Sequence, residues 1–319
     1  MDLNALIIGS KGQDGQLLAD YLSTQNINVT GVNKYGLSNK DDFSCSFDLN
    51  SIESLKLFLS KYPQQHIYYL AAHHKSSHGN TEQEGSEFSA CFDTHVTNIR
   101  NILEAVLIAS PNTRVFYASS SLIFGESENS LFDENSLQNP TCAYGITKKM
   151  GMDIIKWYRD HHGLFACSGI LFNHESWLRS PNFLSRKIIQ TAVKIKHGLE
   201  DKLVVGNLNA QTDWGFAPDF VEAFYAMLLA NKPDDYVIAS GVSHTVKDWV
   251  EYAFGYLNLD YKKYVFEDKN LILRNKPVMI GNTNKIKKNL QWSTSTRFDK
   301  MIEIMINKEI EYANRTIDI

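Results

Sequence analysis

The sequence predicts an α/β fold, in which a doubly wound parallel sheet is joined to a smaller mixed α/β domain. A strand, a glycine-rich turn and a helix open the chain, and short apolar strands then alternate with amphipathic helices as far as residue 172. The alternation breaks after that point. We expect residues 1–172 to form the sheet domain and residues 173–319 mainly the second domain, with further sheet elements returning around 204–242.

The composition is that of an ordinary soluble globular protein and excludes several classes. The chain has 319 residues, of which 43% are hydrophobic and 21% charged, and its net charge is -4. No basic stripe points to nucleic acid, and no apolar run approaches the ~20 residues of a membrane span. The start shows no signal peptide, so we expect a cytoplasmic protein. Four cysteines without paired spacing predict neither disulfides nor a metal site.

The first strand–turn–helix unit carries a nucleotide-binding pattern. An apolar run at 5–8 leads into a turn with three glycines, and leucines then recur at helical spacing. The glycines allow a tight turn and the close approach of a pyrophosphate to backbone N–H groups at the helix start. We therefore expect a Rossmann-type sheet that binds a dinucleotide at Gly9, Gly12, Gln13, Asp14 and Gly15.

The residue at the end of the second strand, 29–32, should contact the adenosine ribose of that cofactor. An acidic residue there selects NAD and an arginine selects NADP, but this chain has Asn33 followed by Lys34. Asp48 and Leu49 lie either beside the adenine or in a surface turn. The strand at 67–72 completes the expected cofactor site with Leu70, Ala71 and Ala72.

Two further helices are predicted, at about 94–109 and 144–162, with strands at 114–118 and 165–171. Each helix has an apolar stripe, which indicates either buried core or a dimer interface formed by the helix pair. The stripes are Ile99, Leu103 and Val106 on the first helix, and Met152, Ile155 and Tyr158 on the second.

A serine, tyrosine and lysine set follows the strand at 114–118. Tyr144 and Lys148 are four residues apart and share one helix face. A phenol has a pKa of about 10, and an ammonium nearby should lower it. Ser120 or Ser121 could then orient a substrate alcohol while Tyr144 removes its proton. The set predicts oxidation of an alcohol, with the hydride passing to a nicotinamide.

With these motifs together, the chain resembles the extended short-chain dehydrogenase/reductase superfamily and, within it, the GDP-mannose 4,6-dehydratases. The closer resemblance rests on segments spread over nearly the whole chain: 12–15, 169–176, 182–187, 206–208, 213–215 and 237–239. It implies a GDP-sugar substrate held by Asn173, Phe183, Leu184, Lys187 and Arg274.

The chain departs from that family at positions that matter for the chemistry. The dehydratases have a Thr-Ser-Glu motif whose glutamate removes a proton so that water can leave, and here Ser120, Ser121 and Leu122 stand in its place. Loss of a general base costs about 10²- to 10⁴-fold, so elimination should be lost while oxidation is kept. The family has an arginine that binds the diphosphate of the GDP-sugar, and this chain has Thr212 at that position, which cannot pair with phosphate as arginine does. The family also has paired arginines that bind the NADP phosphate and help to form a tetramer, and this chain lacks them. Their absence favours NAD as the cofactor but does not exclude NADP. We expect either a homodimer or a homotetramer.

We therefore expect NAD-dependent oxidation of the carbon 4 hydroxyl of a GDP-sugar to a 4-keto sugar without dehydration. The resemblance implies GDP-D-glycero-D-manno-heptose, in capsular polysaccharide synthesis, as the substrate. The reduced cofactor would need an outside oxidant, such as a 2-oxo acid, or exchange with free NAD. The alternatives are a 4-epimerase, a dehydratase with another base, and a non-catalytic sugar-nucleotide-binding subunit.

Overall fold

The computed structural model describes residues 3–34, 36–37, 47–73, 84–271 and 278–317. Its main feature is a seven-stranded sheet in the order β11-β7-β5-β4-β1-β2-β3, parallel except for the antiparallel pair β2 and β3. The carboxyl ends of β1 and β4 adjoin where the chain crosses between the two halves of the sheet, the position at which open α/β sheets bind ligands. The strands are β1 (Asn4–Ile8), β2 (Asn28–Asn33), β3 (Gly36–Leu37), β4 (His66–Tyr69), β5 (Arg114–Ala118), β7 (Ala166–Leu171) and β11 (Tyr236–Ile238).

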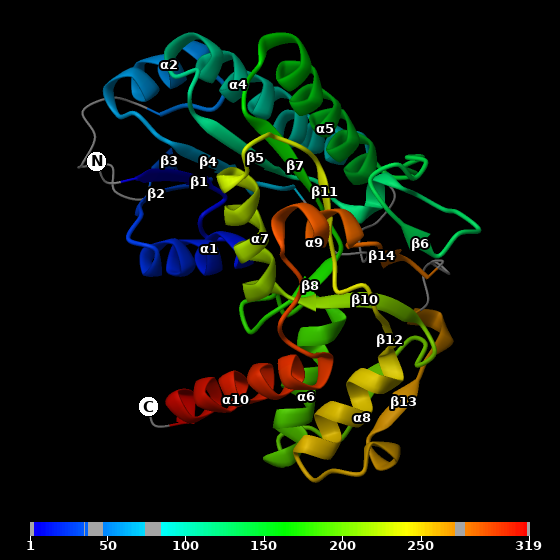
Figure 1. Cartoon of the computed structure of the whole chain (residues 1–319). Coiled ribbons are helices and arrows are strands. Elements are labelled where there is room, and N and C mark those ends of the chain that lie inside the picture. Colours follow the sequence, from blue (N-terminus) through cyan, green and yellow to red (C-terminus); the bar gives the residue numbers. More distant parts are fainter. Residues whose placement is uncertain (1–2, 35, 38–46, 74–83, 272–277, 318–319) are drawn as a thin grey trace.

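Helices cover both faces of this sheet, as Figure 1 shows. One face carries α2 (Ile52–Lys61), α4 (Asn98–Ala109) and α5 (Ala143–His162), and the other carries α1 (Gln13–Thr24) and α7 (Ala217–Leu229). The apolar stripes of α4 and α5 are buried in the core beneath them, with every stripe residue at most 8% exposed. Packing inside one chain therefore accounts for both stripes, and the dimer-interface alternative for these residues is wrong.

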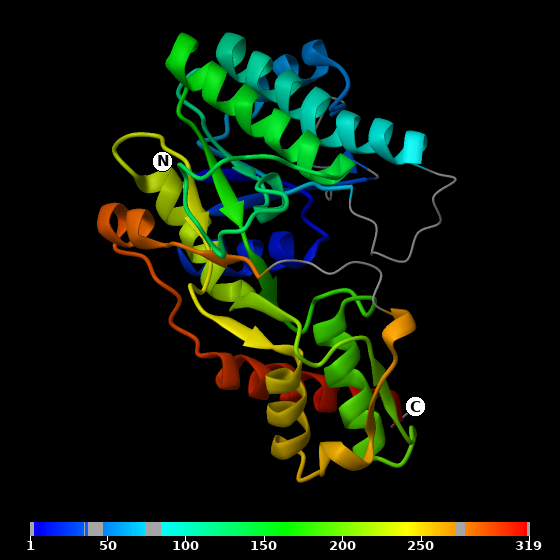
Figure 2. The ribbon, with the colours of Figure 1, turned by 90° about the vertical axis from the view of Figure 1, so that its right-hand side faces the viewer.

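The smaller part of the molecule lies beyond the carboxyl ends of the large sheet (Figure 2). Its core joins three helices to a three-stranded sheet in the order β12-β10-β8 and a two-stranded pair of β9 and β13. The elements are β8 (Asn173–Glu175), α6 (Leu184–Lys196), β9 (Leu203–Val205), β10 (Gln211–Phe216), β12 (Ser243–Thr245), α8 (Val246–Tyr256), β13 (Val265–Glu267) and α10 (Phe298–Ile317).

Short elements complete the described chain. The sequence order is α3 (Glu84–Phe92), the π-helical turn η3 (Asp93–Thr97), the 3₁₀ turn η4 (Ser121–Ile123), β6 (Leu131–Phe132), the 3₁₀ turns η5 (Tyr261–Lys263) and η6 (Lys269–Leu271), β14 (Ile280–Gly281) and α9 (Asn284–Leu290). The predicted α/β fold class is confirmed. Within the described residues, no helix is both long and apolar enough to cross a membrane.

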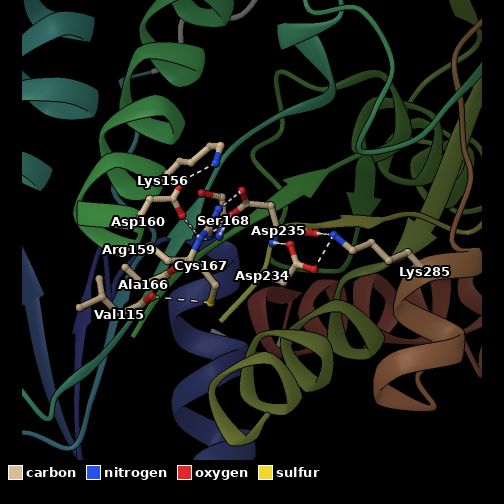
Figure 3. A network of polar contacts seen from close by, with 10 residues as sticks. All are labelled: Val115, Lys156, Arg159, Asp160, Ala166, Cys167, Ser168, Asp234, Asp235 and Lys285. Atoms are coloured by element: carbon tan, nitrogen blue, oxygen red, sulfur yellow. Dashed lines mark hydrogen bonds and ion pairs between the residues drawn. The ribbon is translucent and has the colours of Figure 1, made fainter. Parts of the chain in front are cut away.

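A buried ion pair fastens the last strand of the large sheet to the end of α5 (Figure 3). Arg159 donates to both carboxylate oxygens of Asp235, at 2.9 and 2.7 Å, and Asp235 also accepts from the backbone N–H of Ser168 at 2.7 Å. Lys285 donates to the backbone carbonyl of Asp235 and pairs with Asp234. Because Asp235 immediately precedes β11, this network fixes the sheet at the amino end of that strand.

Candidate active site

Two glycines of the turn between β1 and α1 leave no room for a side chain. Gly9 has a φ of 98°, and a Cβ there would lie 2.8 Å from the backbone nitrogen of Ala71. A Cβ on Gly15 would lie 2.3 Å from the carbonyl oxygen of Gly9, while Gly12 is the N-cap residue of α1. The turn thus lies directly against the segment of Leu70 and Ala71 after β4. This arrangement fits a pyrophosphate placed at the amino end of α1.

The other residues expected to contact the cofactor lie around this turn. Asn33 ends β2 and pairs with Gly36 across the tight hairpin to β3. Ala72 follows β4 and is exposed. Asp48, in contrast, accepts hydrogen bonds from the backbone and side-chain nitrogens of Asn50, at 2.9 and 3.2 Å, just before α2. Asp48 therefore forms a turn at the start of that helix, which favours the surface-turn alternative over a contact with adenine.

Leu49, its neighbour, packs against the core beneath α2 and α4. The backbone carbonyl of Leu49 accepts a 2.9 Å hydrogen bond from the amide nitrogen of Asn101. In the described structure this residue therefore helps to fix the start of α2 on α4.

Gln13 and Asp14 make contacts that the sequence did not predict. These contacts connect α1 to the segment around β8. Gln13 donates to the carbonyl of His174 at 3.2 Å and accepts from the hydroxyl of Ser176 at 2.9 Å. A carboxylate oxygen of Asp14 lies 3.0 Å from Nε2 of His174, and Nδ1 of that ring lies 2.7 Å from the carbonyl of Phe172. Both ring nitrogens therefore face acceptors, which favours the doubly protonated imidazolium.

Electrostatics support a charged pair between Asp14 and His174. Burial opposes ionisation of both groups, but their mutual attraction and hydrogen bond outweigh it. The pKa of the Asp14 carboxyl is lowered and the pKa of His174 is raised. This pair joins the cofactor turn to the second part of the molecule.

Tyr144 and Lys148 come together in the first two turns of α5. The helix begins after Cys142, whose thiol accepts from the backbone N–H of Gly145 at 3.4 Å. Lys148 is 1% exposed and donates to the carbonyl oxygen of Ala118 at 2.7 Å, and its ammonium nitrogen lies 5.6 Å from the centre of the Tyr144 ring. The lysine therefore connects the end of β5 to the tyrosine. The four-residue spacing predicted that the two side chains share a helix face, but it did not predict the contact with β5.

The two serines follow β5 at the same edge of the sheet. Ser120 is half-buried and accepts from the backbone N–H of Leu122 at 3.3 Å, so its side chain caps η4. Ser121 is buried at 8% exposure. Because Ala118 ends β5 and holds Lys148, Ser120 lies two residues from the point where the lysine contacts the strand.

The pKa of Tyr144 is not lowered by Lys148, so the expectation from their four-residue spacing is wrong. Burial raises the pKa of Tyr144 above its ordinary value, and the positive charge of Arg179 opposes this increase. Burial also lowers the pKa of Lys148 to about 7, while the charges of Cys91 and Asp14 oppose that decrease. Lysine at this site is therefore only partly charged at neutral pH, which weakens the help it can give a phenolate.

Leu122 is the residue expected at the position of the dehydratase glutamate. Its side chain is half-buried in η4, and a Cβ on Gly145 would lie 2.5 Å from its carbonyl oxygen. The backbone of Leu122 therefore packs against the first turn of α5, close to Tyr144. Glu126 and Glu128, the next carboxylates along the chain, are both exposed.

The residues expected to hold a GDP-sugar lie on β8 and at the start of α6. Asn173 is exposed at the first position of β8, and Leu184 is 37% exposed at the start of α6. The guanidinium of Arg179 lies 3.7 Å from the centre of the Phe183 ring. The ammonium of Lys187, exposed on α6, donates to the carbonyl of Val204 at 2.8 Å. Arg274 lies outside the described residues.

A parallel sheet with a glycine turn at its switch point, and a Tyr-Lys pair on the helix beside β5, defines an extended short-chain dehydrogenase/reductase. The chain belongs to the GDP-mannose 4,6-dehydratase family, which matches it over residues 6–305. It is therefore an enzyme of that superfamily, as the sequence predicted.

Individual relatives agree with this assignment, and solved structures agree with the fold. GDP-mannose 4,6 dehydratase 2 of Arabidopsis thaliana is 36% identical over 98% of this chain and 88% of its own length. The human GDP-mannose 4,6 dehydratase is 30% identical over 96% of this chain and 91% of its own. The dTDP-glucose 4,6-dehydratase of Bacillus anthracis, in complex with NAD, superposes with a TM-score of 0.78 at 18% identity, covering 98% of each chain. The UDP-glucose 4-epimerase of Thermotoga maritima, with UDP-glucose, has a TM-score of 0.81 at 16% identity and covers 99% of this chain and 100% of its own.

Proposed function

We propose that this enzyme oxidises the carbon 4 hydroxyl of a GDP-sugar with NAD and releases the 4-keto sugar without loss of water. One observation carries the proposal: Tyr144 and Lys148 are in place, whereas Leu122 stands where the dehydratases have the glutamate that starts elimination. A leucine side chain has no group that can accept a proton. Oxidation and elimination are therefore separated in this chain.

The cofactor half of the site is the crevice at the switch point of the large sheet. NAD, when bound, supplies the acceptor for the hydride that leaves carbon 4. The turn of Gly9, Gly12 and Gly15 would hold its pyrophosphate at the amino end of α1, because a side chain at Gly9 would collide with Ala71 and one at Gly15 with the backbone of the turn itself. Asn33, at the end of β2, would face the adenosine ribose.

In the proposed reaction the phenolate form of Tyr144 accepts the proton of the carbon 4 hydroxyl and becomes the phenol, and Ser120 orients that hydroxyl with Ser121 beside it. Lys148, held by the carbonyl of Ala118, supplies positive charge next to the phenolate when it is protonated. Carbon 4 loses a hydride and its oxygen loses a proton, so the C–O bond becomes a carbonyl.

The second part of the molecule would hold the nucleotide-sugar, so residues 1–172 serve the cofactor and residues 173–319 mainly the substrate. We assign this role to Asn173, Phe183, Leu184, Lys187 and Arg274. Thr212 on β10 is half-buried and cannot form the bidentate pair that arginine makes with phosphate. The proposed substrate is GDP-D-glycero-D-manno-heptose, for capsular sugar synthesis in the cytoplasm. The proposed oxidant of the reduced cofactor is a 2-oxo acid, and the proposed assembly is a homodimer or a homotetramer.

The test is mass spectrometry of the products formed from GDP-mannose and GDP-D-glycero-D-manno-heptose, with NAD and a 2-oxo acid present. A product that has lost two hydrogens and kept its carbon 6 oxygen is expected. A product that has lost a water molecule contradicts the proposal, and so does an isomer of unchanged mass formed without net NADH, which indicates a 4-epimerase. The matched control is Tyr144→Phe, which should form none of these products.

A further inference from the structure

The π-helical turn η3 is fixed to the two strands that end at the site. The hydroxyl of Tyr69, on β4, donates to the carbonyl of Thr94. The hydroxyl of Tyr117, on β5, donates to the carbonyl of His95 at 3.1 Å. Turns of this kind are rare and occur often at functional sites. The turn therefore holds His95 at a fixed place next to the carboxyl ends of β4 and β5.

The ring of His95 connects the segment after β4 with the first turns of α5. His95 is fully buried, and its Nε2 accepts a 3.1 Å hydrogen bond from the backbone N–H of His73. A backbone N–H can only donate, so Nε2 is unprotonated and Nδ1 carries the proton. Nδ1 then donates to the hydroxyl of Thr147 at 2.8 Å, and that hydroxyl donates to the carbonyl of Ala143 at 2.8 Å. A neutral imidazole with one defined tautomer links these elements.

The same ring contacts Tyr144 directly. The two rings meet edge to face, with their centres 5.1 Å apart and an angle of 82° between their planes. Two turns beyond Tyr144 along α5, a Cβ on Gly151 would lie 2.3 Å from the hydroxyl of Tyr117 and 2.4 Å from the carbonyl of His95. Helix α5 thus packs against the π-helical turn so closely that this position requires glycine.

We propose that His95 is a positioning residue for Tyr144. Its neutral ring contacts the edge of the tyrosine ring and fixes the first turn of α5 through the hydrogen bond to Thr147. The inference rests on the proposed role of Tyr144 in proton removal. His95 is fully buried, and its part is to set the distance and angle at which the phenol meets the carbon 4 hydroxyl. Misplacement of a reacting group by about 1 Å can lower the rate about 100-fold, so a shift of Tyr144 should be measurable as a lower kcat.

The second hydrogen bond of the ring connects it to the segment that adjoins the cofactor turn. His73 follows Leu70 and Ala71, which lie against the glycine turn. Its N–H is held by His95, and its carbonyl accepts from the thiol of Cys91 at 3.4 Å. The ring therefore sets the spacing between the segment that adjoins the cofactor turn and the helix that carries Tyr144 and Lys148.

Three substitutions separate the contacts of the ring. His95→Phe keeps an aromatic edge against Tyr144 and loses both hydrogen bonds. His95→Asn places an amide near Nδ1 and can still donate to Thr147, whereas His95→Gln places a carbonyl near Nε2 and can still accept from His73. We expect kcat of His95→Phe to fall about 10- to 100-fold while both KM values change less than about 3-fold. His95→Asn should recover part of kcat, because it keeps the hydrogen bond to Thr147 but loses the edge contact, and His95→Gln should recover less.

A second measurement needs no substrate. Protein labelled with ¹³C at the ζ carbon of tyrosine gives a signal for Tyr144, which is identified by its loss in Tyr144→Phe. We expect this signal and its pH titration to change in His95→Phe and in Thr147→Val, and to return toward the wild type in His95→Asn. The double variant His95→Phe/Thr147→Val should have the same kcat and the same Tyr144 signal as His95→Phe, because each substitution removes the same hydrogen bond between His95 and Thr147.

The outcomes distinguish this inference from the proposed function. If no GDP-sugar is oxidised but the Tyr144 signal moves as expected, positioning by His95 stands and the proposed function fails. If oxidation is observed while kcat and the Tyr144 signal of a folded His95→Phe match the wild type, His95 is only a core residue and the inference is overturned. Should His95→Phe fail to fold, Thr147→Val carries the same test, and an unchanged kcat and Tyr144 signal in that variant overturn it.

Discussion

The ammonium nitrogen of Lys148 donates a 2.7 Å hydrogen bond to the carbonyl oxygen of Ala118, the last residue of β5. Lys148 is 1% exposed, and the rings of Tyr117 and Tyr144 lie 5.1 and 5.6 Å from its nitrogen. A buried lysine with one carbonyl partner loses part of its charge, because burial lowers its pKa to about 7. The group that assists Tyr144 is therefore placed by the strand and tuned by burial.

Replacement of Lys148 should reduce activity and change how stability depends on pH. Lys148→Met should lower kcat about 10²- to 10⁴-fold, because the base Tyr144 loses the positive charge that stabilises its phenolate. The pKa of Lys148 is about 7 in the folded protein and 10.5 ordinarily. Between pH 7 and pH 10.5, Lys148 is therefore protonated in the unfolded chain and mostly neutral in the folded protein. The stability contributed by Lys148 is present above pH 10.5 and is lost as pH falls through about 7.

Urea unfolding at pH 6, 8 and 10 measures this dependence. Lys148→Met should be more stable than the wild type at pH 6, and the difference should shrink as pH rises. The control is Lys149→Met, next to it on α5, whose side chain is 32% exposed and pairs with Asp153. Equal pH dependence in the two variants would argue against a buried, partly neutral Lys148.

The pair of Asp14 and His174 should stabilise the fold over a limited pH range. The Asp14 pKa is lowered from 3.8, so its contribution is present above pH 3.8 and is lost as pH falls through the lowered value. The His174 pKa is raised from 6.5, so its contribution is present below pH 6.5 and is lost as pH rises through the raised value. Asp14→Asn should therefore cost about 1–3 kcal/mol of unfolding free energy at pH 5 to 6, and less at high pH.

Asp20→Asn serves as the control for that pair, because Asp20 lies on the same helix and is exposed. Chemical unfolding from pH 4 to 9 gives both curves. A constant difference between Asp14→Asn and the wild type across this range would mean that the pair is not charged in the folded protein.

The ion pair of Arg159 and Asp235 should support stability without affecting catalysis. Its side chains are 12% and 10% exposed, and removal of one partner from a buried pair costs about 3–5 kcal/mol. Asp235→Asn should lose stability of this order, while Asp234→Asn, whose side chain is 45% exposed, should lose about 0–1 kcal/mol. Arg159 lies near the carboxyl end of α5, about 20 Å along the helix from Tyr144, so kcat should stay within about 2-fold. A large fall in kcat for folded Asp235→Asn would show that the network reaches the site.

Features encoded by neighbouring residues were predictable from the sequence. The strand at 114–118 and the helix at about 144–162 appear as β5 (Arg114–Ala118) and α5 (Ala143–His162). The glycine turn and the Tyr144–Lys148 face were predictable for the same reason, since each depends on a few adjacent positions and one helical turn.

Contacts between distant parts of the chain were not predictable in this way. Ser176 meets Gln13 across 163 positions, and His95 meets Thr147 across 52. The π-helical turn around His95 leaves no periodic signal over five residues. The pKa of Lys148 depends on burial, which the four-residue spacing does not contain. Tertiary packing decides each of these, so local pattern could not supply them.

Restoring the carboxylate at position 122 should restore elimination. The backbone there is held on both sides: the N–H of Leu122 donates to Ser120 at 3.3 Å, and its carbonyl packs against Gly145. Leu122→Glu therefore should place a carboxylate beside Tyr144 without moving η4. We expect this variant to form a product that has lost water, about 10²- to 10⁴-fold faster than the wild type does.

The matched variant Leu122→Gln decides whether a proton acceptor is what the wild type lacks. Glutamine has nearly the shape of glutamate and the polarity to bind water, but its amide does not act as a base at neutral pH. If Leu122→Glu eliminates water and Leu122→Gln only oxidises, the missing carboxylate is the reason that the two half-reactions are separate. If both variants eliminate water, access of solvent to the 4-keto sugar controls the outcome, and Leu122 acts by excluding water from the site. Product masses from GDP-mannose, measured for the wild type and both variants at equal oxidation, separate these two accounts.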